Sequence, residues 1–182
     1  MQKILLLCIV SSLTTYGQGI VRLSNFDPSL GIDAKVALPD GTGAGAGITA
    51  QLLLVRAGGA LTPLTPTTTF QTASEDVKFY VNPVDVVVPG VPPGQSATFR
   101  FIFYSTSAGS YDAAANDPLA FYGQWNDVTV PFLGGDPGGG GAILPAAPLL
   151  GLGFQSLTLV PEPGTIALGI LGGLALLARR RK

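Results

Sequence analysis

The chain has 182 residues, of which 47% are hydrophobic and only 12% charged, which excludes a highly charged disordered protein. A net charge of −1 excludes the basic surface of a nucleic-acid-binding protein, so we expect no nucleic-acid partner. The chain has no histidine, and its only cysteine is Cys8. These counts exclude a Ser-His-Asp or Cys-His catalytic site and remove the usual ligands of zinc.

Residues 1–17 have the three-part layout of a secretory signal peptide. Lys3 precedes an apolar run over residues 4–10, and Thr15 and Gly17 are small residues at positions −3 and −1 of a cleavage site before Gln18. The alternative is a short buried strand. A signal peptide predicts export through the Sec translocon and removal by signal peptidase. The mature chain then has no cysteine and forms no disulfide.

The C-terminal end predicts a second membrane signal. Residues 165–178 form an apolar run that predicts a short transmembrane helix, below the roughly 20 residues of a permanent anchor. The basic tail follows directly, with Arg179, Arg180, Arg181 and Lys182, and such clusters stay on the cytoplasmic side. Residues 18–160 are therefore expected outside the inner membrane. The alternative, a buried core helix, does not account for the terminal cations.

The motif Val160, Pro161, Glu162, Pro163 comes just before this apolar run. The motif, the short helix and the arginine cluster, in this order, resemble the PEP-CTERM sorting signal of Gram-negative bacteria over residues 160–182. The resemblance implies that an exosortase, a membrane-embedded cysteine protease, recognises residues 161–182 as the sorting signal and removes the tail. It also implies a link to exopolysaccharide and the biofilm matrix. The domains that carry this signal vary widely within the family.

Residues 18–160 predict one all-β domain, with five basic and ten acidic residues and therefore a net charge of −5. Turn signals at roughly ten-residue intervals are typical of an antiparallel β-sandwich, Ig-like or jelly-roll-like, with seven to nine short strands. The expected strands are residues 19–24, 33–38, 48–56, 77–81, 84–88, 97–105, 120–125, 127–130 and 154–160.

Two finer patterns accompany these strands. Alternation in residues 97–105 places Phe99, Phe101 and Phe103 on one face of a strand, with Arg100 and Ile102 on the other. Residues 110–117 give the one internal helix signal, which ends before a proline, and residues 134–153 predict a Gly/Pro-rich loop.

Carboxylates are the remaining candidates for catalysis. Glycosidases use two carboxyl groups about 5–9.5 Å apart, and Asp112 with Asp117 is the candidate pair that the sequence offers. Asp112, Asn116 and Asp117 also offer oxygen ligands for calcium, at a spacing unlike that of an EF-hand. Scattered surface acids are the simpler interpretation. We therefore expect no enzymatic activity, no catalytic residue, no cofactor and no metal, with an Asp-based hydrolase as the remote alternative.

Aromatic residues give the best binding hypothesis. Tyr122 and Trp125 lie close in the sequence, with Tyr104 and Tyr111 upstream, and exposed rings of this kind stack on sugar faces. The competing interpretation places Trp125 in the core of the sandwich. The sequence thus predicts an exported surface or extracellular-matrix protein, with an inner-membrane intermediate and a structural or adhesive role. The alternative is a polysaccharide-binding module that uses Tyr122 and Trp125.

Overall fold

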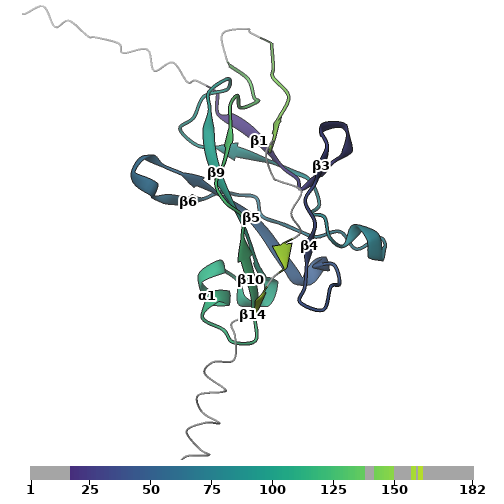
Figure 1. The fold of residues 1–182 in the computed structure, drawn as a ribbon. Helices are drawn as coiled ribbons and strands as arrows, with labels where there is room; N and C mark the ends of the chain where they lie inside the picture. The colour runs from purple at the N-terminus through teal and green to yellow at the C-terminus, as the bar shows by residue number, and fades with distance from the viewer. Residues whose placement is uncertain (1–16, 138–141, 150–156, 159, 162–182) are drawn as a thin grey trace, which may run out of the picture.

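The computed structural model describes residues 17–137, 142–149, 157–158 and 160–161 (Figure 1). Strands make up 41% of the structure and helices 16%, which confirms a mostly β chain with antiparallel sheets. Residues 1–16 of the expected signal peptide and residues 162–182 lie outside the described residues. Within the described part, no helix has the length and apolar character needed to cross a membrane.

The larger sheet is built on two long central strands. β5 (Ile48–Val55) and β9 (Ala97–Ser105) pair antiparallel along their whole shared length. The strand order is β14-β10-β9-β5-β6, with β11 paired to β9 and β7 paired to β5. The shorter strands of this sheet are β6 (Leu61–Pro63), β7 (Thr68–Thr69), β10 (Phe121–Gln124), β11 (Val128–Val130) and β14 (Val160–Pro161).

The smaller sheet has the order β12-β1-β8. Its β1 and β8 are antiparallel, whereas β12 runs parallel to β1 although it lies in the stretch expected to be a loop. Two further strand pairs, β2 with β3 and β4 with β13, complete the described strands, and β4 and β13 are also parallel. The strands are β1 (Gly19–Leu23), β2 (Phe26–Asp27), β3 (Ile32–Asp33), β4 (Val36–Ala37), β8 (Val84–Val88), β12 (Ala147–Pro148) and β13 (Leu157–Thr158).

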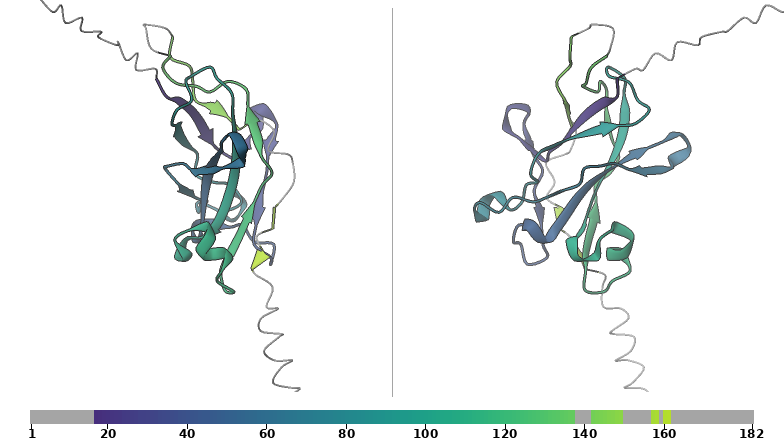
Figure 2. Two further views of the ribbon diagram at one scale, coloured as in Figure 1. Left: turned by 90° about the vertical axis from the view of Figure 1, so that its left-hand side faces the viewer. Right: turned by 180° about the vertical axis from the view of Figure 1, so that it is seen from behind.

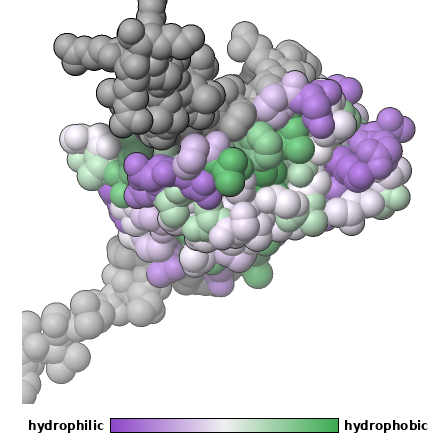
Figure 3. Space-filling model, turned by 90° about the horizontal axis from the view of Figure 1, so that it is seen from below, coloured by the Kyte–Doolittle hydropathy of each residue, from purple (hydrophilic) through white to green (hydrophobic). Residues whose placement is uncertain are grey.

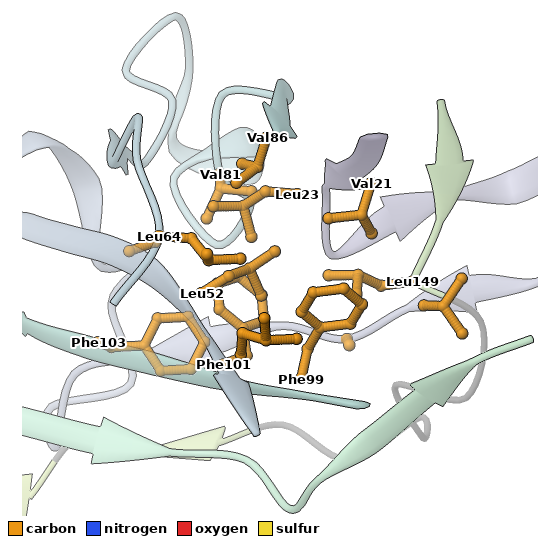
Figure 4. Packing of buried hydrophobic residues seen from close by; sticks show 14 of the residues in the cluster. Val21, Leu23, Leu52, Leu64, Val81, Val86, Phe99, Phe101, Phe103 and Leu149 are labelled. Atoms are coloured by element: carbon orange, nitrogen blue, oxygen red, sulfur yellow. The ribbon is translucent and has the colours of Figure 1, made fainter. Parts of the chain in front are cut away.

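The two main sheets share one hydrophobic core (Figure 4). As predicted, the three phenylalanines of β9 face this core, where each is at most 2% exposed. Burying side chains of this size stabilises the fold by about 1.5–3 kcal/mol each. The core residues from the two sheets include Val21, Leu23, Val86 and Val88 on one side and Leu52, Leu54, Phe99, Phe101 and Phe103 on the other.

A buried polar residue, Asn25, ties three segments together. Its Nδ2 donates to the carbonyl oxygens of Ala34 at 2.7 Å and Phe79 at 3.0 Å, and its Oδ1 accepts from the N–H of Val81 at 2.8 Å. Residues 77–81 were expected to form a strand, and this prediction is wrong. The 3-10 turn over Glu75–Val77 runs into this segment, and the N–H groups of Lys78 and Tyr80 are used in local turn hydrogen bonds to Glu75 and Val77. Asn25 then binds the Phe79 carbonyl and the Val81 N–H, and within the described residues the segment makes one isolated bridge, from Val81 to Phe70.

The helical elements are short. α1 (Tyr111–Ala115) confirms the helix signal in shortened form, because the Ser110 hydroxyl accepts from the N–H of Ala113 at its start and the chain leaves the helix before Pro118. Figure 2 shows α1 and the β5–β6 hairpin as projections from the large sheet. The 3-10 turns are η1 (Pro28–Leu30), η2 (Gly45–Gly47), η3 (Ala57–Gly59), η4 (Glu75–Val77) and η5 (Thr106–Ala108).

Candidate functional site

The outer face of the large sheet, opposite the core, carries a groove of about 440 Å³. β5, β9 and β10 form its floor, while β6 and α1 form its walls. Its volume lies within the roughly 300–1,000 Å³ range of ligand pockets. We call this feature the outer groove; it is lined by Gln51, Leu53, Leu61, Pro63, Arg100, Ile102, Ser110, Tyr111, Asp112 and Gln124.

The floor is organised by strand register. Ile102 on β9 lies opposite Gln51 on β5 and opposite Gln124 on β10. Residues directly opposite each other share a face, and neighbouring strands lie about 4.8 Å apart, so one amide flanks Ile102 on each side. Gln51 is held by a 3.1 Å hydrogen bond from its Nε2 to the carbonyl oxygen of Leu64. The Gln51 amide keeps one N–H donor and its carbonyl acceptor for a ligand, and the Gln124 amide also carries donors and an acceptor.

The cation of the groove is Arg100, which forms a two-pronged ion pair with Asp127. Nε donates to Oδ1 at 2.7 Å and Nη2 donates to Oδ2 at 3.1 Å. The hydrogen bond from Arg100 lowers the pKa of Asp127, and the same bond raises the pKa of Arg100. The guanidinium charge is therefore compensated inside the fold, with both side chains about one third exposed.

Tyr111 at the start of α1 supplies the aromatic wall. Its ring is half-buried and lies perpendicular to the ring of Tyr122, with the centroids 5.7 Å apart. Burial raises the pKa of Tyr111, so its hydroxyl is uncharged at neutral pH. Tyr122, a predicted stacking residue, packs against the Tyr111 ring and does not itself line the groove.

Trp125, the other predicted stacking residue, packs on the opposite side of the sheet. Its ring centroid lies 5.0 Å from that of Phe101 and 4.8 Å from that of Phe103, both in the core between the sheets. The structure thus separates Tyr122 from Trp125 and favours the core interpretation for Trp125.

Sequence reasoning missed Gln51, Gln124 and the wall position of Tyr111. Gln51 is a polar residue within the apolar run of β5, and this was the one sequence signal that could have pointed to a binding position on the strand. Its alignment with Gln124 depends on the pairing of strands from distant parts of the chain, which no local pattern reveals.

The side chains of Asn116 and Asp117 bind the local backbone. Asn116 Nδ2 donates to the carbonyl oxygen of Asp112 at 2.7 Å, and Asp117 Oδ1 accepts from the N–H of Leu119 at 2.9 Å. Both aspartates are exposed, and Asp112 alone of the two reaches the groove wall. Across the described residues there is no cluster of three or more His, Cys, Asp or Glu side chains that could hold a metal ion.

The predicted sorting motif begins within the fold. Val160 pairs with Tyr122 and Pro161 with Phe121 at the edge of β10, and the preceding β13 pairs with β4. Figure 3 shows the molecule from below, the end where α1 and β14 lie in Figure 1; apolar and hydrophilic residues are interspersed over its described surface. Glu162, Pro163 and the cationic residues 179–182 lie outside the described residues.

Comparison with protein-family models, with curated proteins and with solved structures finds no match to this chain.

Proposed function

We propose that this chain is an exported adhesive protein of the cell surface or extracellular matrix, which binds exopolysaccharide through the outer groove. The two end segments support export by the Sec translocon, removal of the signal peptide by signal peptidase and sorting by an exosortase. The inner membrane holds the intermediate, with residues 18–160 outside the cytoplasm.

The proposed scaffold is an antiparallel β-sandwich of the Ig-like or jelly-roll-like kind. The shared core of the two main sheets supports this arrangement, although the parallel neighbours β12 and β13 depart from a purely antiparallel pattern. A sheet in such a fold has one face in the core and leaves the other available for binding.

The observation that carries the binding proposal is the composition of the outer groove. Tyr111 gives an aromatic surface, Leu53 and Ile102 give an apolar floor, and Gln51 and Gln124 give hydrogen-bonding groups on either side. A polysaccharide has the matching chemistry, since each sugar ring has an apolar face and a rim of hydroxyl groups. Most ligand sites combine an apolar lining with a few placed polar groups in this way.

We propose binding without catalysis. Hydrolysis of a glycosidic bond needs two carboxyl groups on opposite sides of the bond. Among the described residues that line the groove, Asp112 is the single carboxylate, and it is exposed.

A pull-down on immobilised polysaccharides tests the binding proposal, with the full chain in detergent. Tyr111→Ala is expected to weaken binding about tenfold, which corresponds to about 1.4 kcal/mol. Phe132→Ala is the matched control, because Phe132 is an aromatic residue outside the groove that is 71% exposed. Equal binding by the two variants, or no binding by the unmodified chain to any polysaccharide, would contradict the proposal.

Sorting is tested separately by the intact mass of the protein from membrane and medium fractions of its host. We expect a species that lacks residues 1–17 and the segment beyond the motif. A membrane-bound species that still ends at Lys182 would show that the apolar segment is a permanent anchor.

A further inference from the structure

We infer that the outer groove selects uncharged polysaccharides and rejects acidic ones. The inference rests on the proposed binding function and specifies its ligand class. It follows from the charges around the groove, which form one compensated pair and one exposed acid.

The first step concerns the only cation among the described groove residues. Recognition of a sugar carboxylate needs a free cationic fork, which arginine provides best through two parallel hydrogen bonds. In Arg100, Asp127 takes the Nε–Nη2 edge of the guanidinium, at 2.7 and 3.1 Å. The internal carboxylate therefore compensates the charge and occupies one of the two edges on which a uronic acid could form such a pair.

The second step concerns the unpaired charge on the groove wall. Asp112 is exposed and is in none of the three ion pairs found among the described residues, so it repels an approaching carboxylate. The surrounding domain, residues 18–160, carries a net charge of −5, which adds a repulsion over the roughly 8 Å screening length of physiological salt. A polyanionic chain is disfavoured both at the groove and on its approach.

The remaining polar groups of the groove are neutral. Gln51 and Gln124 supply amides, Ser110 and Tyr111 supply hydroxyls, and the tyrosine is neutral at physiological pH because burial raises its pKa. Amides and hydroxyls match the hydroxyl groups of neutral hexose chains without leaving a buried charge unpaired. The groove therefore fits a neutral glycan such as a glucan or a mannan.

One substitution is expected to change the charge preference of the groove. Asp127→Asn removes the carboxylate that compensates Arg100 while keeping the side-chain shape, so the guanidinium becomes available to an anionic ligand. The fold supplies a matched control, because Arg22 and Asp85 pair across β1 and β8 with nearly the same geometry, at 2.8 and 3.1 Å. Asp85→Asn changes the net charge by the same amount away from the groove.

The experiment measures binding of the full chain, in detergent, to laminarin and mannan as neutral glycans and to alginate and polygalacturonate as acidic ones. We expect the unmodified chain to bind at least one neutral glycan and to bind the acidic ones at least tenfold more weakly. Asp127→Asn should raise binding to acidic glycans at least threefold at low salt, and high salt should abolish the gain. Asp85→Asn should give no such gain.

The outcomes separate the two proposals. Binding to acidic glycans as tight as binding to neutral ones would overturn this inference and leave the binding function standing. An equal gain in Asp127→Asn and Asp85→Asn would overturn the role of the Arg100 pair. Absence of binding to every glycan would remove the proposed function, and this inference with it. The comparison of neutral with acidic glycans on the unmodified chain needs no variant, so it decides the question even where a substitution disturbs folding.

Discussion

The side chain of Asn25 and the backbone of Val81, 56 residues apart, are joined by a 2.8 Å hydrogen bond from the N–H of Val81 to Asn25 Oδ1. Asn25 is fully buried, and its amide also binds two carbonyl oxygens. Through these hydrogen bonds, Asn25 in the connection between β1 and β2 holds residues 79–81, which lead into β8.

We predict that Asn25→Ala lowers the free energy of unfolding by about 3 kcal/mol, because the buried Ala34 carbonyl and Val81 N–H lose the Asn25 amide as their partner. The Phe79 carbonyl loses one of its two hydrogen bonds and keeps the one from the Val36 N–H. Chemical denaturation measures this change. Asn126→Ala is the control, since Asn126 is exposed, and it should shift stability by less than about 0.5 kcal/mol. Similar small effects of both substitutions would show that the Asn25 hydrogen bonds do not hold the fold.

Trp125 is predicted to act through stability. Trp125→Ala removes the ring that packs on Phe101 and Phe103 and should cost about 3 kcal/mol, near the lower end for large aromatic residues because the ring is only half-buried. The folded fraction of the variant should still bind glycan. A stable Trp125→Ala protein that no longer binds would instead support Trp125 as a sugar-stacking residue.

The hydroxyl of Tyr80 gives a pH-dependent prediction. Burial, with a hydrogen bond to Asp33 Oδ1 at 2.6 Å, raises the pKa of Tyr80 to about 12. The folded state thus keeps a proton that the unfolded state loses near pH 10, so the contribution of Tyr80 to stability is complete below pH 10 and is lost as the pH rises to about 12.

Tyrosinate absorbance tests this assignment by difference between the unmodified chain and Tyr80→Phe. The difference curve should have its midpoint near pH 12. A midpoint near pH 10 would contradict the burial and hydrogen bond found for Tyr80.

The exit segment is predicted to belong to the domain. β13 pairs with β4 and β14 pairs with β10, so residues 157–161 connect two sheets. A protein that ends at Ser156 should be about 1 kcal/mol less stable than one that ends at Pro161, which lowers the melting temperature by roughly 4 °C. Thermal unfolding of the two proteins provides the comparison, and equal melting temperatures would show that the segment does not stabilise the domain.

Local patterns were sufficient for the long strands and for α1. The signals are carried by neighbouring residues: the apolar runs of β5 and β9, the alternation of Phe99, Phe101 and Phe103, and the helix signal of residues 110–117 that ends before Pro118. The short strands β6 and β7 escaped prediction because they contain proline and threonine in a stretch typical of loops. The expected strand at residues 77–81 failed because a 3-10 turn over Glu75–Val77 uses its first N–H groups locally, and the distant side chain of Asn25 binds the backbone at its end.

The candidate site was less predictable than the fold. Tyr122 and Trp125 are neighbours in sequence, but they pack on opposite faces of the large sheet. Gln51 and Gln124 are far apart in sequence and come to flank Ile102 only through the pairing of β5, β9 and β10. Strand pairing of this kind depends on the whole fold, so the groove became visible only in three dimensions.

The most direct test of the central claim is an NMR titration of the protein with a neutral oligosaccharide. The side-chain amide signals of Gln51 and Gln124 and the backbone signals of Ile102 and Tyr111 are predicted to shift together with one affinity. Signals from Phe132 should stay unchanged. Shifts centred on Trp125 or Phe132, with the two glutamine side chains unaffected, would contradict the assignment of the outer groove as the binding site.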